Sequence, residues 1–340
     1  MRRTRPLPLG GHPAQALRFA AVVAAYYGAG RCGLLLEVVR GQVTPLWPPT
    51  GIAVAALLLW GLRLWPAVAL GAVLVNWPYG PSLWALAGIS TGNTLAPVCA
   101  VLLLRRVCFS AALGALRDAL SLVFLGALTG MLVSATVGTA VLAGADALRP
   151  GRFWATWSVW WTGDAMGVLL VTPLLLVLFG SPWPRRIPAP RWAEAAALAA
   201  ATAAVTLLAT RTPLNLPFLV FPVLIWAAYR FQVVGGVACA LLMSVLAVPA
   251  ADAGTGPFAG HDVPVRMLIL QALNGSAALT SLVLATVVAQ RDRGHEEIAR
   301  VCVQLSELIG QLTLLKGAPT LPAPAPREPP VAPRSHGGPG

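Results

Sequence analysis

One carboxylate, Asp164, lies inside the apolar segment WSVWWTGDAMGVLLVTPLLL. A charged side chain at membrane depth is costly unless it is paired or hydrated, so such residues are rare and usually functional. We therefore take Asp164 as the first candidate for a ligand-binding or switch residue. The alternatives are a shallow, solvated carboxylate or one paired with an arginine for packing. The arginines that we consider as its partners are Arg31, Arg40 and Arg152.

Two amides and one further arginine also lie in apolar segments and are candidates for the same site. Asn76 and Asn93 could contact a ligand, or they could bond across helices and to carbonyls that a nearby proline frees. Arg31 and Glu37 are six residues apart, which is not the helical spacing of an ion pair. We therefore expect Arg31 to face the interior of the protein.

The sequence contains no recognisable enzyme motif. It lacks a P-loop, a glycine-rich dinucleotide turn, an HExxH zinc motif and a GxSxG nucleophile motif. Its five cysteines form no CxxC pair, and its four histidines are scattered without metal-ligand spacing. We therefore predict that the protein is not an enzyme and that it has no cofactor and no metal site.

The composition identifies an integral membrane protein. Of the 340 residues, 57% are hydrophobic and only 11% are charged, whereas a soluble domain carries about 25% charged residues. The mean hydropathy is +0.74. The net charge of +12 comes from basic residues between apolar runs rather than on one basic face, which favours a topology signal over nucleic-acid binding. We expect no nucleic-acid partner.

Ten apolar segments follow one another along the chain. A membrane span needs about 20 residues, so the second and third are too short to span comfortably and could be tilted spans or a re-entrant hairpin. The prediction is an all-α integral membrane protein, a polytopic helical bundle with eight to ten transmembrane segments. The segments are 16–39, 47–61, 64–77, 82–104, 118–145, 154–179, 192–210, 214–229, 233–251 and 265–289.

The two short segments each begin with Trp-Pro. Pro48, Pro49 and Pro66 fit the first turn of a helix, where a missing N–H costs nothing. Trp47 and Trp65 are residues that favour the boundary between water and lipid. The sequence therefore predicts a short helical hairpin that turns at Gly61-Leu62-Arg63. Its first residues, Trp47 and Pro48, join the candidate site.

The loop arginines predict the orientation. If the N-terminus is cytoplasmic, fourteen arginines fall on the inner side and five on the outer side. Positive residues are enriched in cytoplasmic loops, so both termini are predicted to be cytoplasmic in a multi-pass protein. Only one of the 24 basic residues is a lysine, a composition typical of a GC-rich bacterial gene, so we expect the membrane to be the bacterial inner membrane.

After the last apolar segment, residues 290–316 read QRDRGHEEIARVCVQLSELIGQLTLLK. Apolar residues recur there at the a and d positions of three heptads, which predicts a short cytoplasmic coiled coil and a homodimer. The alternative is a single amphipathic helix on the membrane or on the bundle. From residue 317 the proline- and glycine-rich tail is expected to be disordered. The heptad residues are Ile298, Val301, Leu305, Leu308, Leu312 and Leu315.

These patterns predict four regions. They are a basic cytoplasmic N-terminus at 1–15, a transmembrane domain at 16–290, a signalling-type helix at 291–316 and the tail at 317–340.

Four blocks of the chain together resemble MASE1, a bacterial integral membrane sensory domain. WPPTGIAVAALLLWGLRLWPAVALGAVLVN resembles its signature region; ISTGNTLAPVCAVLLLRR, WWTGDAMGVLLVTPLLL and FLVFPVLIWAAYRFQVVGG resemble later blocks in the same order. The resemblance covers about residues 15–292 and makes Trp161 a further site candidate. The residues at motif positions are Trp47, Pro48, Gly51, Asn76, Asn93, Trp161, Asp164, Gly167 and Pro173.

The resemblance implies a signal-receiving bundle with a cytoplasmic C-terminus. Proteins with this domain usually continue into a histidine kinase, as in two-component systems, or into a diguanylate cyclase. This chain ends at residue 340 without such a domain. We therefore expect a sensory protein that detects a small ligand or a state of the membrane lipids and relays it to a separate kinase or cyclase. The alternatives are a small-solute or proton-coupled transporter or channel, and an assembly subunit without a ligand.

Overall fold

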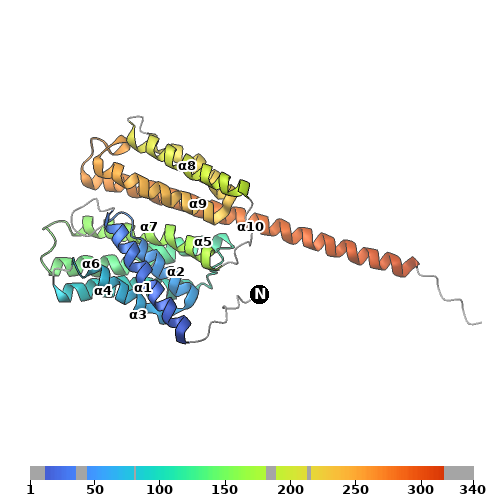
Figure 1. Cartoon of the computed structure of the whole chain (residues 1–340), viewed down its shortest axis with the longest axis horizontal. Coiled ribbons are helices and arrows are strands. Elements are labelled where there is room, and N and C mark those ends of the chain that lie inside the picture. The colour runs from blue at the N-terminus through green and yellow to red at the C-terminus, as the bar shows by residue number, and fades with distance from the viewer. Residues whose placement is uncertain (1–11, 36–43, 80–81, 181–188, 213–215, 318–340) are drawn as a thin grey trace, which may run out of the picture. The chain divides into compact units, whose positions relative to one another are not determined.

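The computed structural model describes residues 12–35, 44–79, 82–180, 189–212 and 216–317, and every regular element in these ranges is helical (Figure 1). Predicted regions 1–15 and 317–340 therefore lie largely outside the described residues. The α-helices are α1 (His12–Leu35), α2 (Pro48–Trp60), α3 (Trp65–Asn76), α4 (Leu83–Arg106), α5 (Leu116–Ser121), α6 (Leu132–Gly144), α7 (Phe153–Gly180), α8 (Ala189–Arg211), α9 (Val220–Ala253) and α10 (Val263–Gly317). The other helical elements are η1 (Leu62–Leu64), η2 (Leu122–Thr129), η3 (Pro217–Leu219) and η4 (Gly256–Phe258).

Six of the described helical stretches are long and apolar enough to cross a membrane. They comprise α4, the continuous stretch from α5 through η2 to α6, α7, α8, the stretch from η3 through α9, and the apolar part of α10. The two shorter apolar stretches are α2 and the run from η1 through α3. The predicted polytopic, all-helical membrane bundle is therefore confirmed.

The Trp-Pro hairpin forms as two short helices. Helix α2 begins at Pro48 and α3 has Pro66 in its first turn, so both helices start where a proline is tolerated. Between them Gly61 adopts a φ of 100°, a conformation that a residue without a Cβ reaches at little cost. Arg63, in the turn, is exposed.

Helix α2 runs parallel to α7 in close contact. A Cβ on Gly51 of α2 would lie only 2.1 Å from the carbonyl oxygen of Gly167 on α7. Further along, the rings of Trp60 and Phe179 meet edge to face, with centroids 6.3 Å apart. Because both pairs advance in the same direction, α2 lies along the second half of α7. The first half of α7 packs against other elements, among them α6, where a Cβ on Gly138 would meet the Trp160 ring.

Helices α4 and α6 pack antiparallel through small residues. A Cβ on Gly88 would meet Val141, and a Cβ on Gly92 would meet Val137. Close approach of this kind is how membrane helices associate where lipid supplies no hydrophobic driving force. Just before α6, η2 is a π-helix, a wide turn that often occurs at functional sites.

The element α9 is a hairpin of two helical halves. Gln232 interrupts it with φ 51° and ψ −138°, and a Cβ on Gly236 would lie 3.0 Å from the Cβ of Ala228. Residues eight apart on one straight helix would be about 12 Å apart along its axis, so the chain reverses at Gln232. Two halves agree with the predicted segments 214–229 and 233–251.

Contacts between distant residues place several helix ends together. Arg230 forms a 2.6 Å ion pair with Glu194, at the start of α8. Gln232 donates to Asp292 of α10, and the nearby Gln290 accepts from the backbone N–H of Leu116. These ends belong to loops that the arginine count assigns to one side of the membrane. That this side is cytoplasmic stays a prediction.

Residues 293–340 form a unit separate from residues 1–292. Its described part is the last portion of α10, in which the apolar heptad residues Ile298, Val301, Leu305 and Leu308 are all exposed. The side chains of Leu312 and Leu315 lie outside the described residues.

Candidate ligand pocket

A short extended segment, Thr44–Trp47, lies against α7 well inside that helix. The backbone N–H of Trp47 donates to the carbonyl of Gly163, at 3.0 Å. A Cβ on Gly163 would lie 2.3 Å from the Thr44 carbonyl oxygen, and one on Gly167 would lie 2.0 Å from that of Trp47. Glycine is therefore required at both positions for this close approach. Gly163 and Gly167, four residues apart on α7, thus accommodate this non-helical backbone, and Gly167 also meets helix α2 at Gly51.

Non-helical backbone is tolerated at membrane depth only where protein or a water-filled cavity surrounds it. Pro45 within this segment and Pro48 directly after it have no N–H that needs an acceptor. The Pro45 carbonyl accepts from Gln271 Nε2 at 3.1 Å, and the Thr44 hydroxyl donates to the Leu46 carbonyl at 2.9 Å. Pro45 and Pro48 thus reduce the number of backbone N–H groups that must find a hydrogen-bond acceptor.

The Asp164 carboxylate is buried, with a residue exposure of 1%. Its Oδ1 accepts a hydrogen bond of 2.6 Å from the Thr50 hydroxyl of α2, and its Oδ2 accepts one from the Ser134 hydroxyl of α6. A shallow, solvated carboxylate is therefore excluded. The described residues give it these two hydroxyls and the Trp160 indole as partners, and no arginine; Arg40 lies outside them.

A cavity opens beside Asp164, where α1, α3, α4 and α7 meet the extended segment. Its empty volume, which includes the open mouth, is about 460 Å³. The lining combines one carboxylate, two amides, two hydroxyl groups and two indole rings. These residues are Leu34, Thr44, Trp47, Asn76, Tyr79, Asn93, Trp160 and Asp164.

Four of the residues predicted from sequence therefore meet at one cavity: Trp47, Asn76, Asn93 and Asp164. Pro48 follows Trp47 directly and begins α2. The prediction that Trp47 marks the membrane interface is wrong, because this residue packs against Gly33 and the middle of α7.

Two predicted residues do not line the cavity. Trp161 stacks on Trp157, with centroids 5.6 Å apart, and donates its indole N–H to the Leu128 carbonyl of η2. Arg31 is exposed, so the prediction that it faces the interior is wrong. Its guanidinium donates to the Tyr79 hydroxyl at 3.3 Å.

The amide of Asn76 makes a local bond rather than one across helices. Its Nδ2 donates to the carbonyl of Ala72, one turn earlier, at 2.8 Å. A carbonyl accepts only from the amide nitrogen, so this bond fixes the orientation of the side chain. The amide oxygen is then the atom that Asn76 offers to the cavity.

The prediction missed Thr44, Thr50, Tyr79, Ser134 and Trp160. Ser134 and Thr50 are common residue types in membrane helices, so nothing in the sequence singles them out. They become hydrogen-bond donors to Asp164 only because α2, α6 and α7 pack together. Trp160 had a signal in the tryptophan-rich run of α7, but periodicity alone does not separate it from Trp161. Within the described ranges, no three His, Cys, Asp or Glu side chains come together to hold a metal ion.

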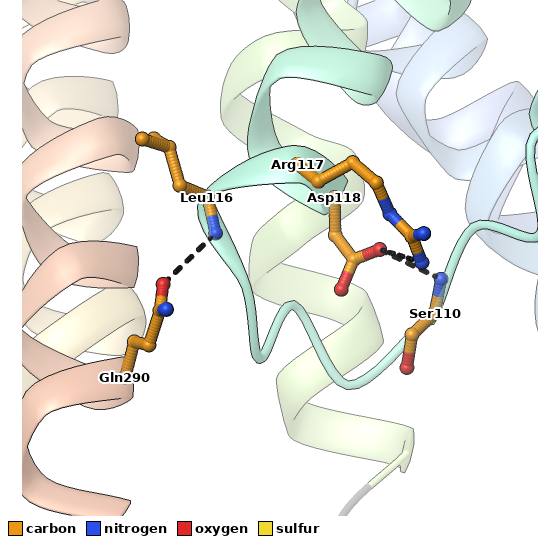
Figure 2. A network of polar contacts seen from close by, with 5 residues as sticks. All are labelled: Ser110, Leu116, Arg117, Asp118 and Gln290. Carbon is orange, nitrogen blue, oxygen red and sulfur yellow. Dashed lines mark hydrogen bonds and ion pairs between the residues drawn. The ribbon is translucent and has the colours of Figure 1, made fainter. Parts of the chain in front are cut away.

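At one end of the bundle, a polar contact joins α10 to the first residue of α5 (Figure 2). The Leu116 N–H donates to Gln290 Oε1 at 3.3 Å. The buried Asp118 accepts from the Ser110 backbone N–H at 3.2 Å and lies 4.0 Å from the Arg117 guanidinium. Helix α10 thus has defined contacts just before the unit that starts at residue 293.

The membrane bundle with a buried, hydroxyl-bound carboxylate beside a polar cavity defines the class as a polytopic membrane protein with an intramembrane site. The family model of MASE1 matches residues 17–292, so the chain belongs to the MASE1 family, a membrane sensory domain. No catalytic domain is found in the comparison. No match was found among curated proteins or among solved structures.

Proposed function

We propose that this protein detects a small ligand in the cavity beside Asp164 and relays its presence through α10 to a cytoplasmic signalling partner. The membrane signalling role follows from the family. The observation that carries the finer proposal is the hydrogen bond from Gln271 of α10 to the Pro45 carbonyl. Pro45 is two residues from Trp47, which lines the cavity, and α10 extends from this contact into the heptad.

The relay depends on the segment Thr44–Trp47 having two arrangements of similar energy. A ligand shifts such an equilibrium only by its difference in affinity for the two states. The segment touches the cavity on one side and Gln271 on the other, so a ligand that moves Trp47 also changes the support of α10.

The partner proposal concerns the last part of α10. Its exposed face, Ile298, Val301, Leu305 and Leu308, pairs in our proposal with a second copy of the chain. The dimer then presents the coiled coil to a separate kinase or cyclase. Apolar residues at a and d positions are what such pairing requires.

Disulfide crosslinking tests the relay. The probe is a cysteine in place of Leu305, in a chain whose native cysteines are replaced by serine, in native membranes. We expect crosslinking to change when Asp164→Asn alters the cavity, and to stay unchanged in Asp146→Asn, a matched change at an exposed site. Equal crosslinking in all three chains would contradict the relay.

A further inference from the structure

We propose that the ligand of this cavity is a small organic cation of the alkylammonium class. The inference rests on the proposed function, because it names the ligand of the same site. The juxtaposition behind it is a buried carboxylate, two indole rings and a lining in which the donors of Thr44 and Asn76 are already used.

The charge of the cavity is the first argument. Among the described lining residues, Asp164 carries the one acidic group, and no lysine, arginine or histidine accompanies it. Its hydrogen bonds come from neutral donors, the hydroxyls of Thr50 and Ser134 and the indole of Trp160. Buried charges are normally paired, and neutral donors leave the net charge in place. A monovalent cation completes the pair.

The second argument is the direction of the hydrogen bonds. The Asn76 nitrogen is engaged by the Ala72 carbonyl, so this residue offers its amide oxygen to the cavity. The Thr44 hydroxyl hydrogen is engaged by the Leu46 carbonyl, which leaves the oxygen lone pairs of Thr44. Acceptors therefore accumulate beside Asp164. A ligand that donates N–H groups or carries a positive charge suits this lining, whereas an anion meets repulsion.

The aromatic rings give the third argument. Trp47 and Trp160 line the cavity with Tyr79. Alkylated ammonium groups bind at aromatic faces, and tryptophan is the strongest such partner. Arg31 donates to the Tyr79 hydroxyl but is not among the lining residues, so its charge does not replace the ligand at Asp164.

Calorimetric titration of the purified full chain in maltoside micelles tests the proposal. The probes are choline and its neutral isostere 3,3-dimethylbutan-1-ol, which have the same shape and differ in charge. We expect choline to bind at least about tenfold more tightly, as a charge-assisted contact requires. Asp164→Asn should abolish this preference, while the exposed-site control Asp146→Asn should retain it.

A second variant guards against a loss of folding in Asp164→Asn. Trp160→Leu keeps the carboxylate and removes one ring, and we expect it to weaken choline binding on the order of fivefold while the alcohol is little affected. Equal affinity for choline and the alcohol would overturn the proposal. A preference for choline over the alcohol that survives in Asp164→Asn would overturn it too. A preference that appears only in Arg40→Gln would also overturn it, because Arg40 would then be the cation that pairs with Asp164.

The same titrations, read by crosslinking at position 305, separate this inference from the proposed function. If the alcohol but not choline changes crosslinking, sensing stands and the cation class is wrong. If choline binds without any change in crosslinking, the cation site stands and the relay is wrong.

Discussion

The hydroxyl of Thr50, in the first turn of α2, donates a 2.6 Å hydrogen bond to the Asp164 carboxylate of α7. This bond joins the short helical hairpin to the central helix at the edge of the cavity. It also gives the Trp-Pro motif a structural purpose. The prolines and glycines bring the start of α2 far enough into the bundle to reach a buried charge.

Replacing Thr50 tests how much this bond contributes. Thr50→Val keeps the shape of the side chain but leaves one carboxylate oxygen without its donor, which should destabilise the protein by about 1–3 kcal/mol. Thr50→Ser retains the hydroxyl and should be close to wild type. Thermal unfolding in detergent provides the measurement. If Thr50→Val costs as much in an Asp164→Asn chain as in wild type, the two residues are not coupled.

Gly167 should not accept a side chain. A Cβ there would lie 2.0 Å from the Trp47 carbonyl oxygen, so Gly167→Ala must displace the extended segment. We expect a loss of about 1–3 kcal/mol, as for other overpacked sites. Gly28→Ala is the control, since a Cβ at Gly28 meets nothing within 4 Å. Equal melting temperatures for the two variants would show that α7 and the segment do not pack in this way.

Gln271→Leu should separate ligand binding from relay. The change removes the bond to the Pro45 carbonyl, and neither Gln271 nor Pro45 is among the residues that line the cavity. We therefore expect binding in the cavity to persist, while the crosslinking response at position 305 disappears. The control is Ser276→Ala, an exposed position of α10 whose hydroxyl bonds only within its own helix. A full response in Gln271→Leu would show that α10 receives the signal elsewhere.

The heptad face should determine the oligomeric state. Leu305→Asp places a charge at an a position of the proposed coiled coil and should convert the dimer to a monomer, as measured by light scattering in detergent. Glu307→Gln, at an exposed neighbouring position off the a and d stripe, should leave the mass unchanged. A dimer that persists in Leu305→Asp would place the contact between copies elsewhere.

Asp164 was predictable from sequence because a carboxylate in an apolar run is conspicuous. The reversal within α9 was predictable too. The charged Arg230 interrupts the apolar sequence there and divides it into two separate runs, 214–229 and 233–251. Both features depend on the local order of residues, which the sequence contains directly.

The partners of Asp164 were not predictable. Arginine is the ordinary expectation for a buried carboxylate, but Thr50 and Ser134 supply hydroxyls from helices that lie far apart in sequence. Their meeting depends on how closely α2 and α6 approach α7. Trp47 was misplaced for a similar reason: a tryptophan before a proline is typical of an interface, and only the glycines of α7 reveal that the segment enters the bundle.

The close packing of the Trp47 carbonyl against Gly167 fixes the position at which α2 begins on α7. Because the Trp47 carbonyl lies directly against the α7 backbone at Gly167, sliding α2 along α7 would break this contact, whereas a tilt of α2 about it would keep it. Helix α2 is 13 residues long, about 20 Å at the helical rise. A tilt of about 3° at the cavity therefore carries its far end, at Trp60, by about 1 Å. A small displacement caused by a ligand in the cavity would thus be amplified at the opposite end of α2.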